Sequence, residues 1–110
     1  MKKLLFLLAI LFGTTSIALA QSSSHYYQEA EKYEREAQYY YRKYENAKHY
    51  AESYRRSARN ARTASGASDF SSTADRFQRE ANAHYQTYQR MSQQAANCRR
   101  QADNLSRQNR

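Results

Sequence analysis

Small and aromatic residues recur at alternating intervals of three and four through the first half of the chain. The positions that share this spacing are Tyr26, Ala30, Tyr33, Ala37, Tyr40, Tyr44, Ala47, Ala51, Tyr54, Ala58 and Ala61. This is the interval of heptad a and d positions, and it continues for about five heptads without a proline. The pattern predicts a long helix, from about residue 24 to about residue 64, that packs this seam against a partner helix.

A second seam with the same spacing follows in the last third of the chain. Its members are Ala74, Phe77, Ala81, His84, Tyr88, Met91, Ala95, Cys98, Ala102 and Leu105. Between the seams, Gly66 is suited to the left-handed conformation in which many helices end, and Ser72 with Asp75 resembles a helix-starting capping box. We therefore predict a turn at about residues 65–71 and a second helix at about residues 72–107.

A short connection makes consecutive helices antiparallel neighbours. The two seams interdigitate, bulky residue against small, when residues are paired so that their numbers total 135. This register places Ala37 opposite Cys98 and Ala51 opposite His84, and on the flanks it places Lys48 beside Tyr85 and Glu34 beside Arg99. The predicted fold is all-α: a long antiparallel two-helix hairpin, an alanine and tyrosine heptad coiled coil, after a cleaved signal peptide.

The first twenty residues have the three parts of a secretory signal peptide. Met1-Lys2-Lys3 is a basic start, Leu4 to Phe12 is an apolar core, and Ala18-Leu19-Ala20 is an A-x-A cleavage site. The alternative is an uncleaved anchor, although the apolar run is short for a membrane span. We expect residues 1–20 to be removed and residues 21–110 to form one helical hairpin domain, exported to a bacterial periplasm or secreted.

The composition of residues 21–110 limits the kind of core that this domain can have. The segment contains one leucine, Leu105, and no isoleucine, valine or tryptophan, so a conventional aliphatic core is excluded. Such a composition raises disorder as a rival, which the regular heptads oppose. An alanine seam also removes little apolar area from water, so an isolated hairpin should be marginally stable.

Several tyrosines fall outside the predicted seam and form a candidate interaction face. They are Tyr27, Tyr39, Tyr41, Tyr50 and Tyr85. One interpretation is that their rings lie along the flanks of the hairpin and cover the seam while the hydroxyl groups stay wet. The other is a second interface, used for a homo-oligomer such as a dimer of hairpins or for a helical protein partner.

The chain is basic, and its positive charge is concentrated near the predicted turn. Of 18 Lys and Arg residues, 16 remain after Lys2 and Lys3 are removed, against 10 acidic residues, so the exported part carries +6. The candidate basic patch consists of Lys48, Arg55, Arg56, Arg59 and Arg62. Its charges either complement a helix C-terminus or attract anionic envelope polymers or a membrane surface. Nucleic acid is a poor candidate for an exported chain that carries no base-reading motif.

The sequence gives no pattern typical of catalysis, of metal binding or of a cofactor. His25 and His49 fall at outward positions without companion ligands, and His84 lies in the seam. No phosphate-binding loop, HExxH or nucleophile elbow is present. Cys98, an odd cysteine in an exported chain, is either a buried thiol or the site of an intermolecular disulfide, and Arg99-Arg100 would favour its thiolate if the helix end frays.

Two classes of function fit these observations. The first is a non-enzymatic structural or interaction protein of the bacterial envelope, a coiled-coil hairpin that self-associates or scaffolds a partner. The second is a basic periplasmic binding or chaperone-like module for anionic envelope polymers, membrane surfaces or unfolded chains. Self-association with weak salt dependence distinguishes the first from the second, which requires a steep salt slope.

Overall fold

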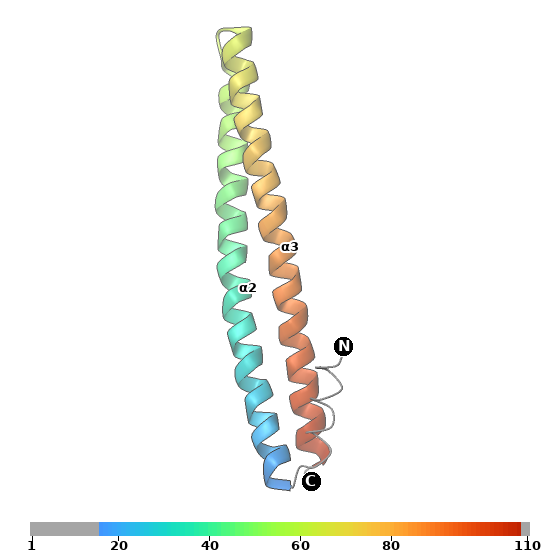
Figure 1. Ribbon diagram of the computed structural model, residues 1–110. Coiled ribbons are helices and arrows are strands. Elements are labelled where there is room, and N and C mark those ends of the chain that lie inside the picture. Colours follow the sequence, from blue (N-terminus) through green and yellow to red (C-terminus); the bar gives the residue numbers. More distant parts are fainter. Residues whose placement is uncertain (1–15, 109–110) are drawn as a thin grey trace. The chain divides into compact units, whose positions relative to one another are not determined.

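The computed structural model describes residues 16–108. They form two long helices with many contacts between them, α2 (Ser16–Arg59) and α3 (Ala64–Gln108), in a hairpin-like arrangement (Figure 1). The prediction of an all-helical chain is confirmed. Most of the predicted signal peptide, residues 1–15, lies outside the described residues, and residues 16–20 begin α2, so cleavage after Ala20 stays a prediction.

The chain divides into two compact units, each containing parts of both helices. The turn unit is Tyr33–Gln93 and includes the connection between the helices. The terminal unit contains described residues 16–32 and 94–108.

The connection between the helices is shorter than predicted and lies earlier in the chain. It comprises residues 60–63, whereas the sequence predicted a turn at about 65–71. The Thr63 hydroxyl accepts a hydrogen bond from the Gly66 amide at 3.0 Å, as a helix N-cap does. Gly66 has no positive φ and lies in the first turn of α3, so its predicted helix-ending role is wrong. Ser72 and Asp75 lie inside α3, so the predicted capping box is wrong too.

The Thr63 cap gives a direct test of where α3 begins. Thr63→Ala should lower the free energy of unfolding by about 0.5–2 kcal/mol, because the Gly66 amide loses its side-chain acceptor. Thr63→Ser keeps the hydroxyl and is the matched control, expected to stay close to the wild-type protein. Urea unfolding of the three proteins measures the effect. Equal midpoints for the alanine and serine variants would contradict this cap.

Charged side chains suit the helix dipole at one end of α2 only. Arg56 and Arg59 lie in the last turn of α2, where cations interact favourably with the helix dipole. The first glutamates of α2, between residues 29 and 36, come more than two turns after its start. Since α2 begins at Ser16, no acidic residue lies in its first turn and these glutamates belong to the helix interior.

The predicted seam is confirmed, because each of its residues is buried or half-buried. Ala61 lies in the connection, and the other members lie on α2 or α3. The buried apolar residues among those described are alanines, with no more than 6% of their surface exposed. They are Ala30, Ala37, Ala47, Ala51, Ala74, Ala81, Ala95 and Ala102. No large side chain among the described residues is fully buried. The core of each unit is therefore a line of methyl groups flanked by partly exposed rings.

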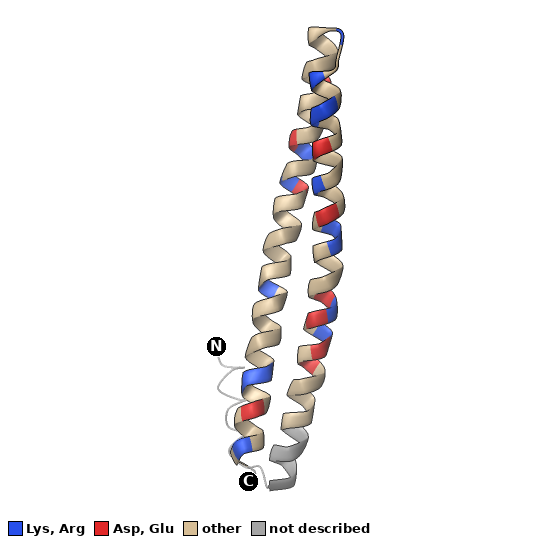
Figure 2. Ribbon diagram, turned by 180° about the vertical axis from the view of Figure 1, so that it is seen from behind, with Lys and Arg blue, Asp and Glu red and all other residues tan. Residues whose placement is uncertain are grey.

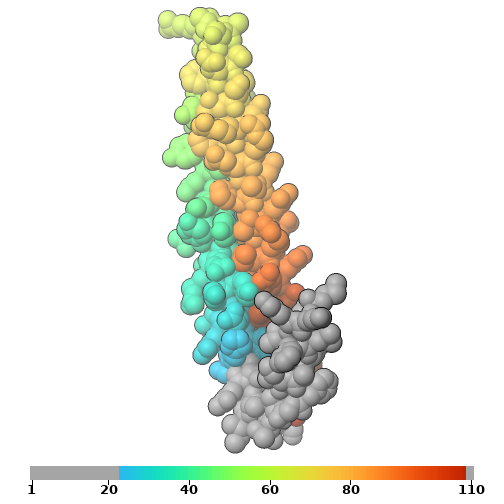
Figure 3. Space-filling model, in the orientation of Figure 1, coloured from blue at the N-terminus to red at the C-terminus, as the bar shows by residue number. Residues whose placement is uncertain are grey.

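The predicted register is wrong in the turn unit. A pairing that totals 135 would place Tyr44 opposite Met91, but the Tyr44 ring contacts Tyr85 with a centroid distance of 5.0 Å. Similarly, Tyr41 contacts Tyr88 at 5.1 Å. The observed partners lie closer to the connecting loop, by about one heptad, as expected if α3 begins about one heptad earlier than predicted. Figure 3 shows side chains of both helices in contact along the visible face of this unit.

Candidate interaction surface

Four tyrosines of the turn unit form a closed set of ring contacts, which we call the four-tyrosine cluster: Tyr41, Tyr44, Tyr85 and Tyr88. Tyr41–Tyr88 and Tyr44–Tyr85 join the two helices at 5.1 and 5.0 Å. Tyr41–Tyr44 and Tyr85–Tyr88, both at 5.7 Å, run along α2 and along α3. All four contacts are tilted, within the range of favourable aromatic pairs, which contribute about 0.5–1.5 kcal/mol each beyond area burial.

A second aromatic group lies nearer the connection between the helices. Phe77 stacks on Tyr54, with centroids 5.6 Å apart and ring planes 8° apart, and contacts Tyr50 at 5.3 Å. Phe70 contacts Tyr54 at 6.2 Å. Phe70 falls within the predicted turn at about residues 65–71, and the earlier start of α3 places it on the helix instead.

The predicted tyrosine face has four members in the turn unit and one in the terminal unit. Tyr39 and Tyr50 are each 52% exposed, Tyr41 is 39% exposed and Tyr85 is 38% exposed. Three of these, all but Tyr39, also contact rings of the other helix, as the first interpretation predicts, and still expose part of their rings. The second interface stays a prediction.

In the terminal unit, Tyr27 is half-buried and donates a hydrogen bond to the Asp103 carboxylate. This hydrogen bond, and secondarily desolvation, raise the pKa of Tyr27 above 10.0. Tyr27 therefore serves as a polar link between α2 and α3 within this unit. Its role differs from that of the exposed tyrosines of the turn unit.

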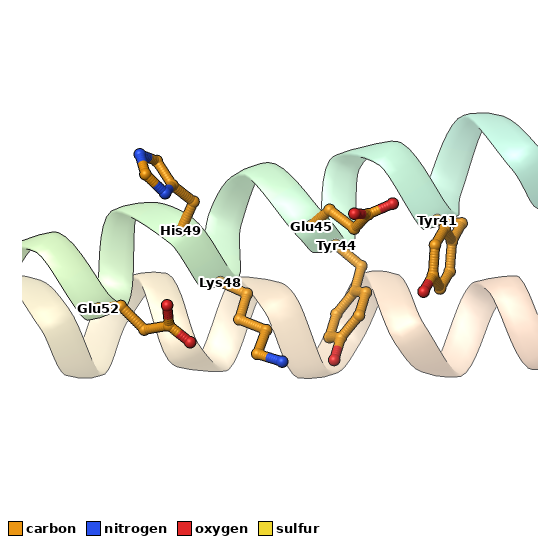
Figure 4. Close-up of a pocket in the computed structure, with 6 residues that line it drawn as sticks. All are labelled: Tyr41, Tyr44, Glu45, Lys48, His49 and Glu52. Atoms are coloured by element: carbon orange, nitrogen blue, oxygen red, sulfur yellow. The ribbon is translucent and has the colours of Figure 1, made fainter.

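A groove of about 230 Å³ lies on α2 beside the four-tyrosine cluster. Its lining residues are Tyr41, Tyr44, Glu45, Lys48, His49 and Glu52. Figure 4 shows the Tyr41 and Tyr44 rings projecting toward the other helix, while His49 points away from it. Lys48 was expected beside Tyr85, but its ammonium group lies 5.9 Å from the centroid of Tyr44 on its own helix. The groove mixes both charge signs and is lined by one helix, so it is suited to surface contact.

The predicted basic patch contains residues with different local roles. Arg55 is half-buried and donates a hydrogen bond to the Gln78 side chain of α3 at 3.2 Å. Arg56, Arg59 and Arg62 are exposed at the end of α2 and in the connection. Figure 2 shows positive segments at this end of the turn unit, together with a long stretch of α3 that carries little charge.

The histidines and Cys98 show no arrangement suited to metal binding. His25 and His49 are exposed, and each lies near the ring of the next residue in the chain. His84, expected opposite Ala51, instead lies 6.1 Å from the Tyr40 ring. Among the described residues there is no group of three or more His, Cys, Asp or Glu side chains placed to hold a metal ion.

Cys98 is half-buried in the terminal unit. Burial raises the pKa of its thiol, and the Glu29 carboxylate raises that pKa further. The thiolate is therefore disfavoured, whereas Arg99-Arg100 were expected to favour it. An intermolecular disulfide at Cys98 stays a prediction.

Ser23 is a contact residue that the sequence analysis missed. It is 6% exposed, and its hydroxyl donates a hydrogen bond to the Ala102 carbonyl at 3.0 Å and lies 2.7 Å from the Ser106 hydroxyl. Ser23 lies three residues before Tyr26 and therefore continues the seam spacing. That spacing was the available signal, but the predicted seam began at Tyr26.

Comparison with known proteins adds no family to this picture. No protein-family model, no curated protein and no solved structure matches the chain. In residues 16–108, neither helix contains an apolar stretch of the length needed to cross a membrane.

Proposed function

We propose that this chain is an exported, non-enzymatic interaction protein of the bacterial envelope. Its hairpin packs as an antiparallel alanine and tyrosine coiled coil and self-associates or scaffolds a helical partner. The observation that supports this proposal is the contrast between core and surface. Alanines fill the core, while Tyr39, Tyr41, Tyr50, Phe70 and Tyr85 remain 37–52% exposed, all in the turn unit.

Burial of this exposed aromatic area against a second copy is energetically favourable. Burial stabilises by roughly 25 cal/mol per Å² of apolar surface, and an alanine contributes little such surface compared with a tyrosine ring. Ordering each backbone residue costs about 1–2 kcal/mol. The alanine seam offsets little of that cost. A second copy that covers the tyrosines buries further apolar area, and this stabilises the folded hairpin. A dimer of hairpins joined through the turn unit is the simplest assembly.

The test is the dependence of assembly and stability on concentration. Sedimentation of the exported part, residues 21–110, should show a species larger than one chain, and the thermal midpoint should rise with protein concentration, as mass action requires. The double variant Tyr41→Ser with Tyr50→Ser should weaken both effects and keep most helical content at high concentration. The matched control is Gln38→Ser with Asn46→Ser, two exposed polar positions on the same helix.

A monomer at every concentration, with a cooperative melt at high temperature, would overturn self-association. Cys98→Ser separates two forms of assembly. Survival of the larger species supports a non-covalent interface, whereas its loss, together with loss of a dimer on non-reducing gels, means that a disulfide holds the chains together.

A second candidate function is a basic module for anionic envelope polymers or membrane surfaces. It is favoured by the exposed Arg56, Arg59 and Arg62 at the loop end of the turn unit. A monomer that binds anionic vesicles with a steep salt dependence would support this function over the first.

A further inference from the structure

We propose that the four-tyrosine cluster is an oxidative cross-linking site. At this site a one-electron oxidant joins α2 to α3 within one chain, through a carbon–carbon bond between Tyr44 and Tyr85 or between Tyr41 and Tyr88. The proposal does not depend on self-association, because both pairs lie within the turn unit of a single chain.

Two pairs of phenol rings lie close together, and each pair has one ring on α2 and one on α3. The centroids are 5.0 Å apart in Tyr44–Tyr85 and 5.1 Å apart in Tyr41–Tyr88, with interplanar angles of 49° and 53°. At such distances the facing ring edges are closer than the centroids, so small side-chain rotations suffice to bring two ortho carbons into contact. Figure 4 shows the α2 members of both pairs directed toward the other helix.

Coupling also requires that a tyrosine ring be accessible to an oxidant in solution, and the cluster meets this requirement. Each pair combines one exposed ring, Tyr41 at 39% or Tyr85 at 38%, with one half-buried ring, Tyr88 or Tyr44. The exposed ring can give an electron to an oxidant in solution and its proton to water. The ring contacts along each helix, both at 5.7 Å, let the radical pass to a neighbouring tyrosine by electron transfer.

The coupling balances as a two-electron oxidation. Each of two phenols loses one electron and its hydroxyl proton, which gives two phenoxyl radicals. Their ortho carbons form one bond, and the two ring hydrogens at those carbons move to the oxygens as the rings become aromatic again. The product has lost two hydrogens in total. A peroxidase supplies the oxidising steps, and one hydrogen peroxide is reduced to two waters.

Other tyrosines of the turn unit lack this arrangement. Tyr54 contacts Phe70 and Phe77, and Tyr50 contacts Phe77, which has no hydroxyl and forms no phenoxyl radical. Tyr39 and Tyr40 contact each other at 5.3 Å, but both lie on α2, so their coupling would not join the helices. The chain has one cysteine and therefore no intramolecular disulfide. Tyrosine coupling is thus a covalent link between α2 and α3 that these residues allow.

The experiment treats the exported part with peroxidase and hydrogen peroxide, and then analyses the monomeric fraction. Trypsin places Tyr41 in peptide 36–42, Tyr44 in peptide 44–48, and both Tyr85 and Tyr88 in peptide 80–90. We expect a monomer that is lighter by two hydrogens, dityrosine fluorescence, and peptide 80–90 joined to 44–48 or to 36–42. An equal mixture of unlabelled and ¹⁵N-labelled chains, oxidised together and digested without separating monomer from larger species, should give joined peptides that carry a single type of label.

Single tyrosine-to-phenylalanine variants identify the pairs. Tyr85→Phe should remove the product joined to 44–48 and keep the product joined to 36–42, and Tyr88→Phe should have the opposite effect. Tyr54→Phe, a seam tyrosine whose ring lies against phenylalanines, is the matched control and should change neither product. The cross-linked monomer should also melt at a higher temperature than the untreated protein.

Three results would overturn the proposal. These are absence of both joined peptides, equal yields from the folded chain and from the chain unfolded in urea, or joined peptides that combine both labels. Each is independent of the sedimentation result, so failure of cross-linking and failure of self-association can be told apart.

Discussion

Ala81→Leu is expected to lower the free energy of unfolding by about 1–3 kcal/mol, because it adds three carbons where the packing leaves no room. Ala81 is 0% exposed and lies on α3 between the half-buried Phe77 and His84 of the same seam. A larger side chain must push the helices apart or force a neighbouring ring from its rotamer. Chemical denaturation followed by circular dichroism measures the change.

The matched control for this substitution is Ala83→Leu. Ala83 is exposed on the same helix, and alanine and leucine have similar helix propensities, so its effect should stay within about 0.5 kcal/mol. If the two variants unfold at the same denaturant concentration, Ala81 does not face a packed neighbour and the seam of the turn unit is incorrectly described.

Phe77→Ala is expected to cost about 2–3 kcal/mol, below the range for a fully buried phenylalanine because this ring is half-buried. Its ring stacks on Tyr54 and contacts Tyr50, both of α2, and the Arg76 guanidinium lies 5.3 Å from its centroid. Removing the ring therefore deletes the main aromatic contact between the helices near the loop. The measurement is again unfolding in denaturant, at a fixed protein concentration.

Phe70→Ala provides the comparison for Phe77, since the residue type and the helix are the same. Phe70 is 37% exposed and contacts the single ring of Tyr54 at a longer distance, 6.2 Å, so its loss should cost about 1 kcal/mol. A cost for Phe70 equal to or above that for Phe77 would mean that the stacked pair contributes less than its geometry indicates.

The seam was readable from the sequence because packing two helices constrains residue size at every third and fourth position. Small and large residues are mixed along it, and the structure buries most of its alanines while the rings stay partly exposed. The period is a local property of each helix. It therefore holds however the two helices are aligned.

The same repeat prevented a prediction of the register from the sequence. A repeat of seven residues matches itself after a shift of one heptad, so interdigitation alone does not choose between neighbouring alignments. The choice depended on the turn, where the sequence analysis gave most weight to Gly66. In the structure, the Thr63 cap starts α3 earlier and adds about two turns of helix, which bring Phe70 to Tyr54.

The four-tyrosine cluster could not be predicted without that register. Tyr44 and Tyr88 were assigned to the seam and Tyr41 and Tyr85 to the outer face, with no sign that they meet. Only the shifted alignment brings the two sets together. The sequence indicated that tyrosines form a candidate interaction face, but which of their rings pair depends on how the chain folds.

The alanine core also determines how the stability of this protein responds to temperature. The heat-capacity change of unfolding arises chiefly from hydration of newly exposed apolar surface, and is about 12–15 cal/mol/K per residue in ordinary domains. Among the residues that the structure describes, the fully buried apolar groups are methyls, and the large rings are already partly hydrated in the folded state. The heat-capacity change per residue is consequently smaller. The curve of stability against temperature is then shallow, so cooling or moderate warming alters the folded population less than in a protein with a leucine-rich core.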